Sequence, residues 1–130
     1  MRLALLAALV AAAALAACGG DDEASQEPTG STCPDDSSLT YDNFGSLFLG
    51  TYCTGCHSSE LQGIDRHGAP ADHNFDTLAG VLAEAEHVDE AAAAGPDAVN
   101  TFMPPTTADD IPDEAERRQL GEWLACGAPE

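Results

Sequence analysis

Once its first segment is set aside, the chain is short of apolar residues, and this shortage limits how it can fold. Residues 1–17 hold 16 of the 57 apolar residues, and the other 113 residues contain 41, many of them alanine. A domain of about 100 residues depends on buried apolar area for its stability. We therefore expect either that part of the chain is disordered or that something other than side chains fills its middle.

The N-terminus has the form of a secretory signal. Met1-Arg2 precedes a run of fifteen apolar residues, which as a helix would rise about 22 Å, short of the ~30 Å hydrocarbon core of a bilayer. This favours a cleaved signal peptide over residues 1–17, with an uncleaved membrane anchor as the alternative.

The segment after the apolar run predicts a lipid anchor. Leu15-Ala16-Ala17-Cys18 resembles a bacterial lipobox, so Cys18 is predicted to be lipidated and to become the mature N-terminus. That places the protein in the bacterial cell envelope facing the periplasm, and Gly19 favours the outer membrane. Residues 18–32 are predicted to be the lipidated end and a disordered acidic tether, because almost nothing in them is apolar. One domain then covers residues 33–130.

The charge is strongly one-sided. Asp and Glu number 23, against four arginines and no lysine, for a formal charge of −19. A basic footprint for phosphate is missing, so we exclude nucleic acid as a partner. A protein partner is expected to carry a basic docking patch.

The chemistry is concentrated in Cys53-Thr54-Gly55-Cys56-His57. C-x-x-C-H is the attachment signature of c-type haem. Residues i and i+3 share one face of a helical turn, so both thiols can reach one porphyrin edge, and the adjacent His57 can bind the iron. A redox-active dithiol, a zinc site and a structural disulfide are the alternatives. The dithiol lacks flanking alternating strands, and the zinc site lacks a second ligand pair.

Met103 is the predicted second axial ligand. It lies in Thr101-Phe102-Met103-Pro104-Pro105, where paired prolines stiffen the backbone. Its soft thioether would raise the reduction potential of a haem iron. The competing ligands are His67, His73 and His87, each expected to face solvent, and the last alternative is an open iron site.

The apolar spacing predicts three main helices. Tyr41, Phe44, Leu47 and Tyr52 indicate a helix that ends just before Cys53, with Ser38 or Thr40 as its cap. A second helix carries a stripe formed by Leu78, Val81, Leu82 and Ala85, is capped by Asn74 or Asp76, and stops at Gly95-Pro96. The last helix begins at Pro112, buries Leu120, Trp123 and Leu124, and stops at Gly127.

This order of helix, C-x-x-C-H, Gly/Pro loop, helix, Met-Pro loop and terminal helix resembles class I monohaem cytochrome c over residues 38–126. The resemblance implies an all-α fold packed around one covalent haem c. It implies that the first and last helices cross, with Gly45 and Leu49 against Leu120 and Trp123. The core around the haem would comprise Phe44, Leu47, Phe48, Tyr52, Phe75, Leu78, Leu82 and Trp123.

The resemblance also assigns supporting roles. The Pro70 carbonyl would accept the N–H of His57, and Arg66 would pair with a haem propionate or lie on the surface as an ordinary arginine. With Cys18 lipidated and two cysteines on haem, Cys33 and Cys126 remain, and crossing helices would allow a disulfide between them. Lysines that surround the haem edge in mitochondrial-type members are missing here, so their docking rules do not transfer.

The sequence thus predicts one-electron transfer by a membrane-tethered carrier, free or as a subunit of a larger oxidoreductase, rather than an enzyme acting alone. Two alternatives stay open. An open haem site could sense a gas or act as a peroxidase, and a chain without haem could be an envelope thiol–disulfide oxidoreductase.

Overall fold

The structure is a computed structural model that describes residues 26–130. The predicted signal peptide and Cys18 lie outside these residues. The helical elements are η1 (Tyr41–Gly45), α1 (Ser46–Tyr52), η2 (Gly63–Arg66), α2 (Leu78–Ala83), α3 (Ala85–Ala92) and α4 (Glu114–Ala125). Extended pairing in the described part is limited to one isolated bridge, Ala94 with Val99. The all-α prediction is therefore confirmed at the level of secondary structure. None of the described helices is long and apolar enough to cross a bilayer.

The first helix begins and ends where the sequence predicts. Thr40 caps it by accepting the Asn43 N–H at 3.1 Å, and the Asn43 side chain accepts the Thr40 N–H at 2.8 Å. This reciprocal pair satisfies two donors that a helix start leaves free. The first turn, η1, is wider than an α-helical turn and continues directly into α1, which ends at Tyr52 with Cys53 as its C-cap. The helix thus delivers the chain straight into the C-x-x-C-H segment.

The second helical region differs from the prediction in its cap and its continuity. Thr77, rather than Asn74 or Asp76, caps α2 by accepting the Gly80 N–H at 3.1 Å. The helix also breaks at Glu84, which ends α2 and precedes α3. Asp113 caps α4 in a reciprocal pair of hydrogen bonds with Glu116. The helix therefore begins at Glu114, two residues after the predicted start at Pro112.

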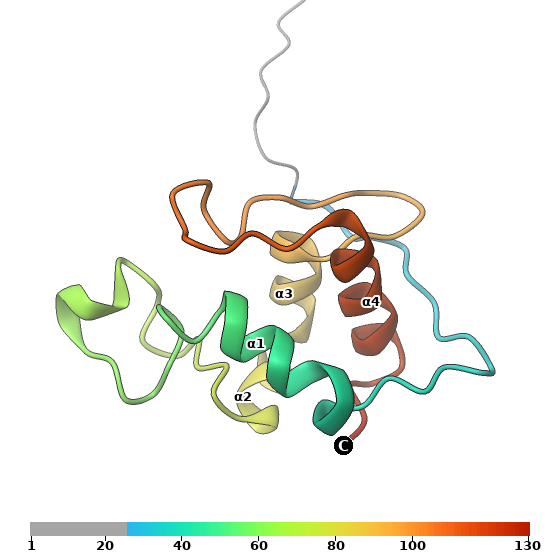
Figure 1. Ribbon diagram of the computed structural model, residues 1–130, viewed down its shortest axis with the longest axis horizontal. Helices are drawn as coiled ribbons and strands as arrows, with labels where there is room; N and C mark the ends of the chain where they lie inside the picture. Colours follow the sequence, from blue (N-terminus) through green and yellow to red (C-terminus); the bar gives the residue numbers. More distant parts are fainter. Residues whose placement is uncertain (1–25) are drawn as a thin grey trace, which may run out of the picture.

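The first and last helices pack against each other through Trp123, as expected. Its indole is fully buried, together with Leu49 and Leu120. A Cβ added to Gly45 would lie 2.6 Å from Cζ2 of Trp123, so glycine permits this approach. Figure 1 shows α1 crossing in front of α3 and beside α4, with the C-terminus near the start of the first helix. The prediction that Leu47 and Leu82 belong to the core is wrong, since their side chains are 72% and 48% exposed.

The disulfide prediction is confirmed. Cys33 and Cys126 are bonded, with Cα atoms 4.7 Å apart and 93 positions between them in sequence. In the chain-entropy account, closing a loop of that length lowers the entropy of the unfolded chain and so stabilises the folded protein by ~4–5 kcal/mol. The bond ties the segment before the first helix to the end of α4.

The predicted tether is too long, because its last residues belong to the folded domain. Thr29 is completely buried, and its N–H and hydroxyl donate to the two carboxylate oxygens of Asp89 at 2.9 and 2.7 Å. The Glu27 N–H donates to Asn100 at 3.1 Å. This segment is held by specific hydrogen bonds rather than apolar burial, so its polar composition gave no sign of order. The domain begins by Glu27, not at Cys33.

The Gly45–Trp123 contact can be tested with a pair of glycines in one continuous helix. We expect Gly45→Ala to lower the free energy of unfolding by about 1–3 kcal/mol, because the indole has no space for the methyl group. Gly50→Ala is the control, since nothing lies within 4 Å of its added Cβ, and better helix propensity should raise stability by up to ~1 kcal/mol. Urea unfolding of the full-length protein measures both. Equal effects of the two substitutions would contradict the packing described.

Candidate functional site

A single large cavity collects most of the residues singled out in the sequence. Its volume is about 750 Å³, within the ~300–1,000 Å³ typical of small-molecule and cofactor sites. The C-x-x-C-H segment, the loop that follows it, α3 and the Met103 loop all contribute to its lining. The predicted residues on its wall are Cys53, Cys56, His57, Arg66, Pro70 and Met103.

The two cysteines lie on one helical turn beyond α1. The Cys56 and His57 N–H groups both donate to the Cys53 carbonyl, at 3.1 and 2.9 Å. This turn brings Cys53 and Cys56, both unpaired thiols, to the same cavity. Burial raises the pKa of the Cys53 thiol to about 12, although the nearby charge of Arg117 opposes the shift. Cys53 is therefore a protonated, weakly nucleophilic thiol in this environment.

The ring of His57 is held in one tautomer. Its Nδ1 lies 3.3 Å from the His73 carbonyl oxygen, which can only accept, so Nδ1 carries the proton and Nε2 keeps the lone pair. The ring also stacks on Phe75, with centroids 4.8 Å apart. Burial lowers the pKa of His57, which favours the neutral imidazole. This is the form of histidine that coordinates a metal.

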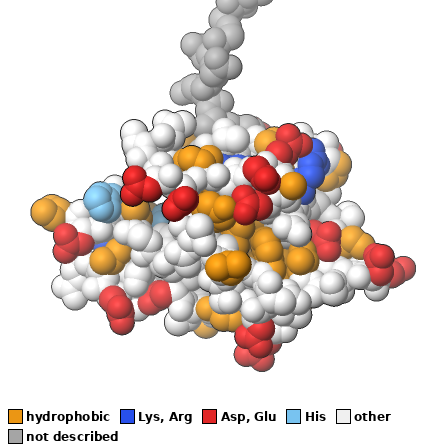
Figure 2. Space-filling model, in the orientation of Figure 1, with side chains coloured by type: hydrophobic (Ala, Val, Ile, Leu, Met, Phe, Trp, Pro, Cys, Tyr) orange, Lys and Arg blue, Asp and Glu red, His pale blue; other side chains and the backbone are white. Residues whose placement is uncertain are grey.

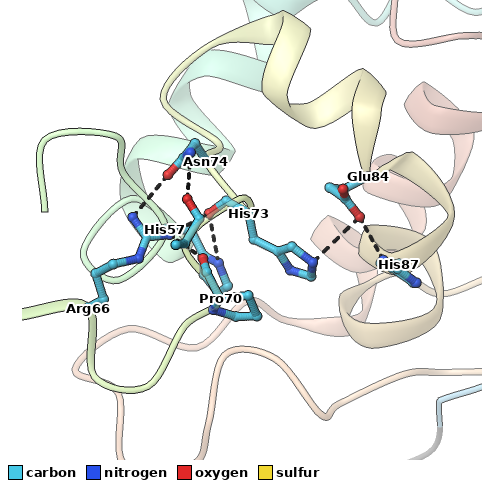
Figure 3. Close-up of polar contacts among 8 residues, drawn as sticks. His57, Arg66, Pro70, His73, Asn74, Glu84 and His87 are labelled. Atoms are coloured by element: carbon cyan, nitrogen blue, oxygen red, sulfur yellow. Dashed lines mark hydrogen bonds and ion pairs between the residues drawn. The ribbon is translucent and has the colours of Figure 1, made fainter. Parts of the chain in front are cut away.

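The carbonyl that holds His57 is not the predicted one. Pro70 was expected to supply it, but the Pro70 carbonyl accepts a hydrogen bond from Arg66 instead, and the His73 carbonyl takes its place beside His57. The Gly/Pro loop turns back on itself, so the acceptor lies three residues later than expected. Figure 3 shows His57 and Arg66 converging on this loop.

Arg66 is buried and structural rather than a surface cation. Its guanidinium donates to the carbonyls of Ser58, Pro70 and His73 and to the side chain of Asn74. The alternative of a surface arginine is therefore wrong, whereas pairing with a propionate stays a prediction, since Arg66 also lines the cavity. Arg66 shapes the loop, and through the shared His73 carbonyl it positions His57.

Met103 reaches the same cavity from a distant part of the chain. Its side chain is half-buried, its N–H donates to the Ala91 carbonyl at 2.8 Å, and Pro104 beside it is buried. The Met103 carbonyl accepts from Nη1 of Arg117 at 2.8 Å. The main chain on both sides of the thioether is therefore fixed to α3 and α4.

Arg117 is a positioning residue that the sequence reading missed. It is 3% exposed, and its Nη1 also donates to the carbonyls of Ala92 and Asn100 at 2.7 and 2.9 Å. Burial lowers the pKa of this guanidinium. Its place three residues before Leu120, on the buried stripe of the last helix, is the signal that could have identified it.

Of the three competing histidines, two match the expectation of a solvent-facing ring and one does not. His67 and His87 are exposed, whereas His73 is half-buried. The His73 ring stacks between those of His57 and His87, with centroids 6.1 and 5.6 Å away. All three residues line the cavity.

Comparison with protein-family models, with curated proteins and with solved structures finds no match for this chain. The functional argument therefore depends on the geometry of the site.

Arg117 provides a test of how the Met103 loop is held. We expect Arg117→Lys to lower the free energy of unfolding by roughly 3 kcal/mol or more, because an ammonium group on a thinner side chain leaves buried carbonyls unpaired. The neighbouring Arg118→Lys is the control: Arg118 is half-exposed and pairs with Glu114 on the surface, a pair worth under ~1 kcal/mol. Urea unfolding of the two variants makes the comparison. A smaller loss at Arg117 than at Arg118 would contradict the role assigned here.

Proposed function

We propose that the protein is a monohaem c-type cytochrome that transfers single electrons, with a fold like that of class I cytochromes c. The observation that carries the proposal is convergence: the C-x-x-C-H segment and Met103, 46 residues beyond His57, line one cavity of cofactor size. A dithiol enzyme would have no need of the methionine, and a structural disulfide would have no need of the cavity.

Each residue that would hold the haem has a position and hydrogen bonds that suit its role. Cys53 and Cys56 would form the two thioether bonds, for which the helical turn gives a common direction. His57 offers the lone pair on Nε2, because the His73 carbonyl holds the proton on Nδ1. Met103 would be the second axial ligand, on a loop whose main chain Arg117 and Ala91 fix. When bound, the haem iron supplies a one-electron couple.

The assignment of both axial positions favours a carrier over an enzyme. With His57 and Met103 both in place, the iron has no position left for a substrate. Because the ligands sit on backbone that is hydrogen-bonded on each side, they can persist through a change of oxidation state. A thioether ligand also raises the reduction potential relative to a nitrogen ligand.

The thiol–disulfide alternative is disfavoured by the environment of Cys53. Catalytic dithiols depend on a thiol whose pKa is lowered by a helix N-terminus or a neighbouring cation. Cys53 lies instead at the C-terminal end of α1, and burial raises its pKa to about 12. The site is better suited to permanent attachment of a group than to repeated thiolate attack.

The proposal places the carrier on the envelope membrane through a lipid on Cys18. Since the folded domain begins by Glu27, at most eight residues separate the anchor from it, which limits the reach to roughly 30 Å. Figure 2 shows acidic side chains spread over the face in view, around scattered apolar ones. A redox partner with a basic patch would be steered to such a surface, an attraction that salt screens.

Covalent haem can be tested with two pairs of cysteines. We expect the full-length protein, produced in a bacterial envelope with haem c assembly, to keep a haem stain on a denaturing gel. Cys53→Ala/Cys56→Ala should lose the stain and most helical circular dichroism, because the thin core then lacks its filler. Cys33→Ala/Cys126→Ala should keep the stain, since those cysteines form the disulfide. An unstained wild-type protein would refute covalent haem. Native helix content in Cys53→Ala/Cys56→Ala would refute the claim that haem fills the core.

The axial role of Met103 is tested by spectroscopy. We expect the oxidised wild type to show a sulfur–iron charge-transfer band and its reduced form not to bind carbon monoxide. Met103→Ala should keep covalent haem, lose the band, bind carbon monoxide and show a lower midpoint potential. His67→Asn serves as the control, because His67 lines the same cavity but is exposed. Carbon monoxide binding by the wild type would favour the open-site alternative, gas sensing or peroxidase-like activity.

A further inference from the structure

At the wall of the proposed haem cavity, which His73 and His87 both line, three side chains form a cluster that the proposed electron transfer does not use. His73 Nε2 lies 3.5 Å from Oε2 of Glu84, and His87 Nδ1 lies 2.7 Å from the same oxygen. The three atoms all lie within 4.8 Å of one another. Figure 3 shows the His73 ring pointing from its loop toward Glu84, with His87 bonded to the same carboxylate oxygen.

The break between α2 and α3 creates this arrangement. Glu84 stands at the junction, ending one helix and preceding the next. His87 is three residues further along and therefore shares its face. His73 comes from the loop before α2, and its ring is enclosed by His57 and Phe75 on one side and His87 on the other. The ligand atoms thus come from two places in the local fold, the loop before α2 and the start of α3.

The composition and spacing of the cluster match a transition-metal site. Two imidazoles and one carboxylate are a common ligand set for Zn²⁺, which leaves the fourth position to water. Metal–ligand bonds of about 2.0–2.1 Å in a tetrahedron separate ligand atoms by roughly 3.4 Å. The His73–Glu84 pair is already at 3.5 Å, whereas His87, at 2.7 Å from the carboxylate, would have to move outward to admit an ion. The side chains of His73 and Glu84 are only 23% and 19% exposed, which limits their freedom, whereas that of His87 is 65% exposed and leaves an entry path.

We propose that His73, Glu84 and His87 bind one divalent transition-metal ion of the zinc or copper class. The site is separate from haem attachment, since it uses none of Cys53, Cys56, His57 or Met103. The bound ion would tie the loop after the haem segment to the start of α3. That loop includes the His73 carbonyl that holds His57, so the ion would also stabilise the support of the proximal histidine.

The test uses the full-length protein as purified from the envelope, freed of adventitious metal by a chelator. Calorimetric titration with Zn²⁺ alone should show one equivalent per chain, and bound Zn²⁺ should raise the melting temperature. Titration with Cu²⁺ should give an electron paramagnetic resonance signal with nitrogen coupling. His87→Gln and Glu84→Gln should each weaken Zn²⁺ binding by more than the ~10–100-fold that loss of an outer-shell contact costs.

His67→Asn is the matched control, because His67 is an exposed histidine outside the cluster and asparagine tolerates its left-handed backbone. It should bind Zn²⁺ as the wild type does. No uptake by the wild type, or equal affinity in His87→Gln and the wild type, would overturn the proposal. With both proteins freed of metal, the haem spectrum should be the same in His87→Gln and the wild type. A changed spectrum in the metal-free proteins would instead make His87 a haem ligand and overturn the metal site. The haem stain and the Zn²⁺ titration are separate measurements on the same folded protein, so the failure of either proposal is seen separately.

Discussion

Three main-chain carbonyls, from Ala92, Asn100 and Met103, converge on one buried guanidinium, that of Arg117. The rest of the candidate site depends on this interaction, because it joins α4 to the end of α3 and to the loop that carries the thioether. Irregular backbone can be buried only where its polar groups find partners. The loop between α3 and α4 has only one isolated bridge and a few main-chain hydrogen bonds of its own, and the guanidinium supplies donors to three further carbonyls.

Arg66 does the same on the other side of the cavity. It donates to five carbonyls of the loop after the C-x-x-C-H segment and shares the His73 carbonyl with His57. Of the three arginines beyond the predicted signal peptide, two are therefore buried as scaffold, and Arg118 pairs with Glu114. This explains how a chain with so few cations leaves its acidic surface almost uncompensated. Thr29 and Asn100 are likewise polar and fully buried, so they are part of the core.

The local rules of helices were enough to predict much of the fold. The cap at Thr40 and the acidic start of α4 follow from spacing and capping chemistry, which act over a few residues. The crossing at Gly45 and Trp123 was expected only from the resemblance to a known family. Predictions failed where contacts between distant parts of the chain decide which side chains are buried. Leu47 and Leu82 fit the helical stripes but face solvent, and residues 27–31 look like a tether but pack against Asp89, Asn100 and Ala94.

The sequence by itself determined which reactive residues are present: the C-x-x-C-H segment, a methionine directly before two prolines, two further cysteines that form the disulfide, and an acidic composition. These depend on residue type and short separations, which the order of the chain specifies directly. Only the tertiary structure decided which carbonyl holds His57, that Arg66 and Arg117 are internal, and that His73, Glu84 and His87 meet. Those contacts depend on how loops fold back in space. Every residue has a main-chain carbonyl, so which one accepts a hydrogen bond from His57 or an arginine is decided by its position in the fold and not by the residue type.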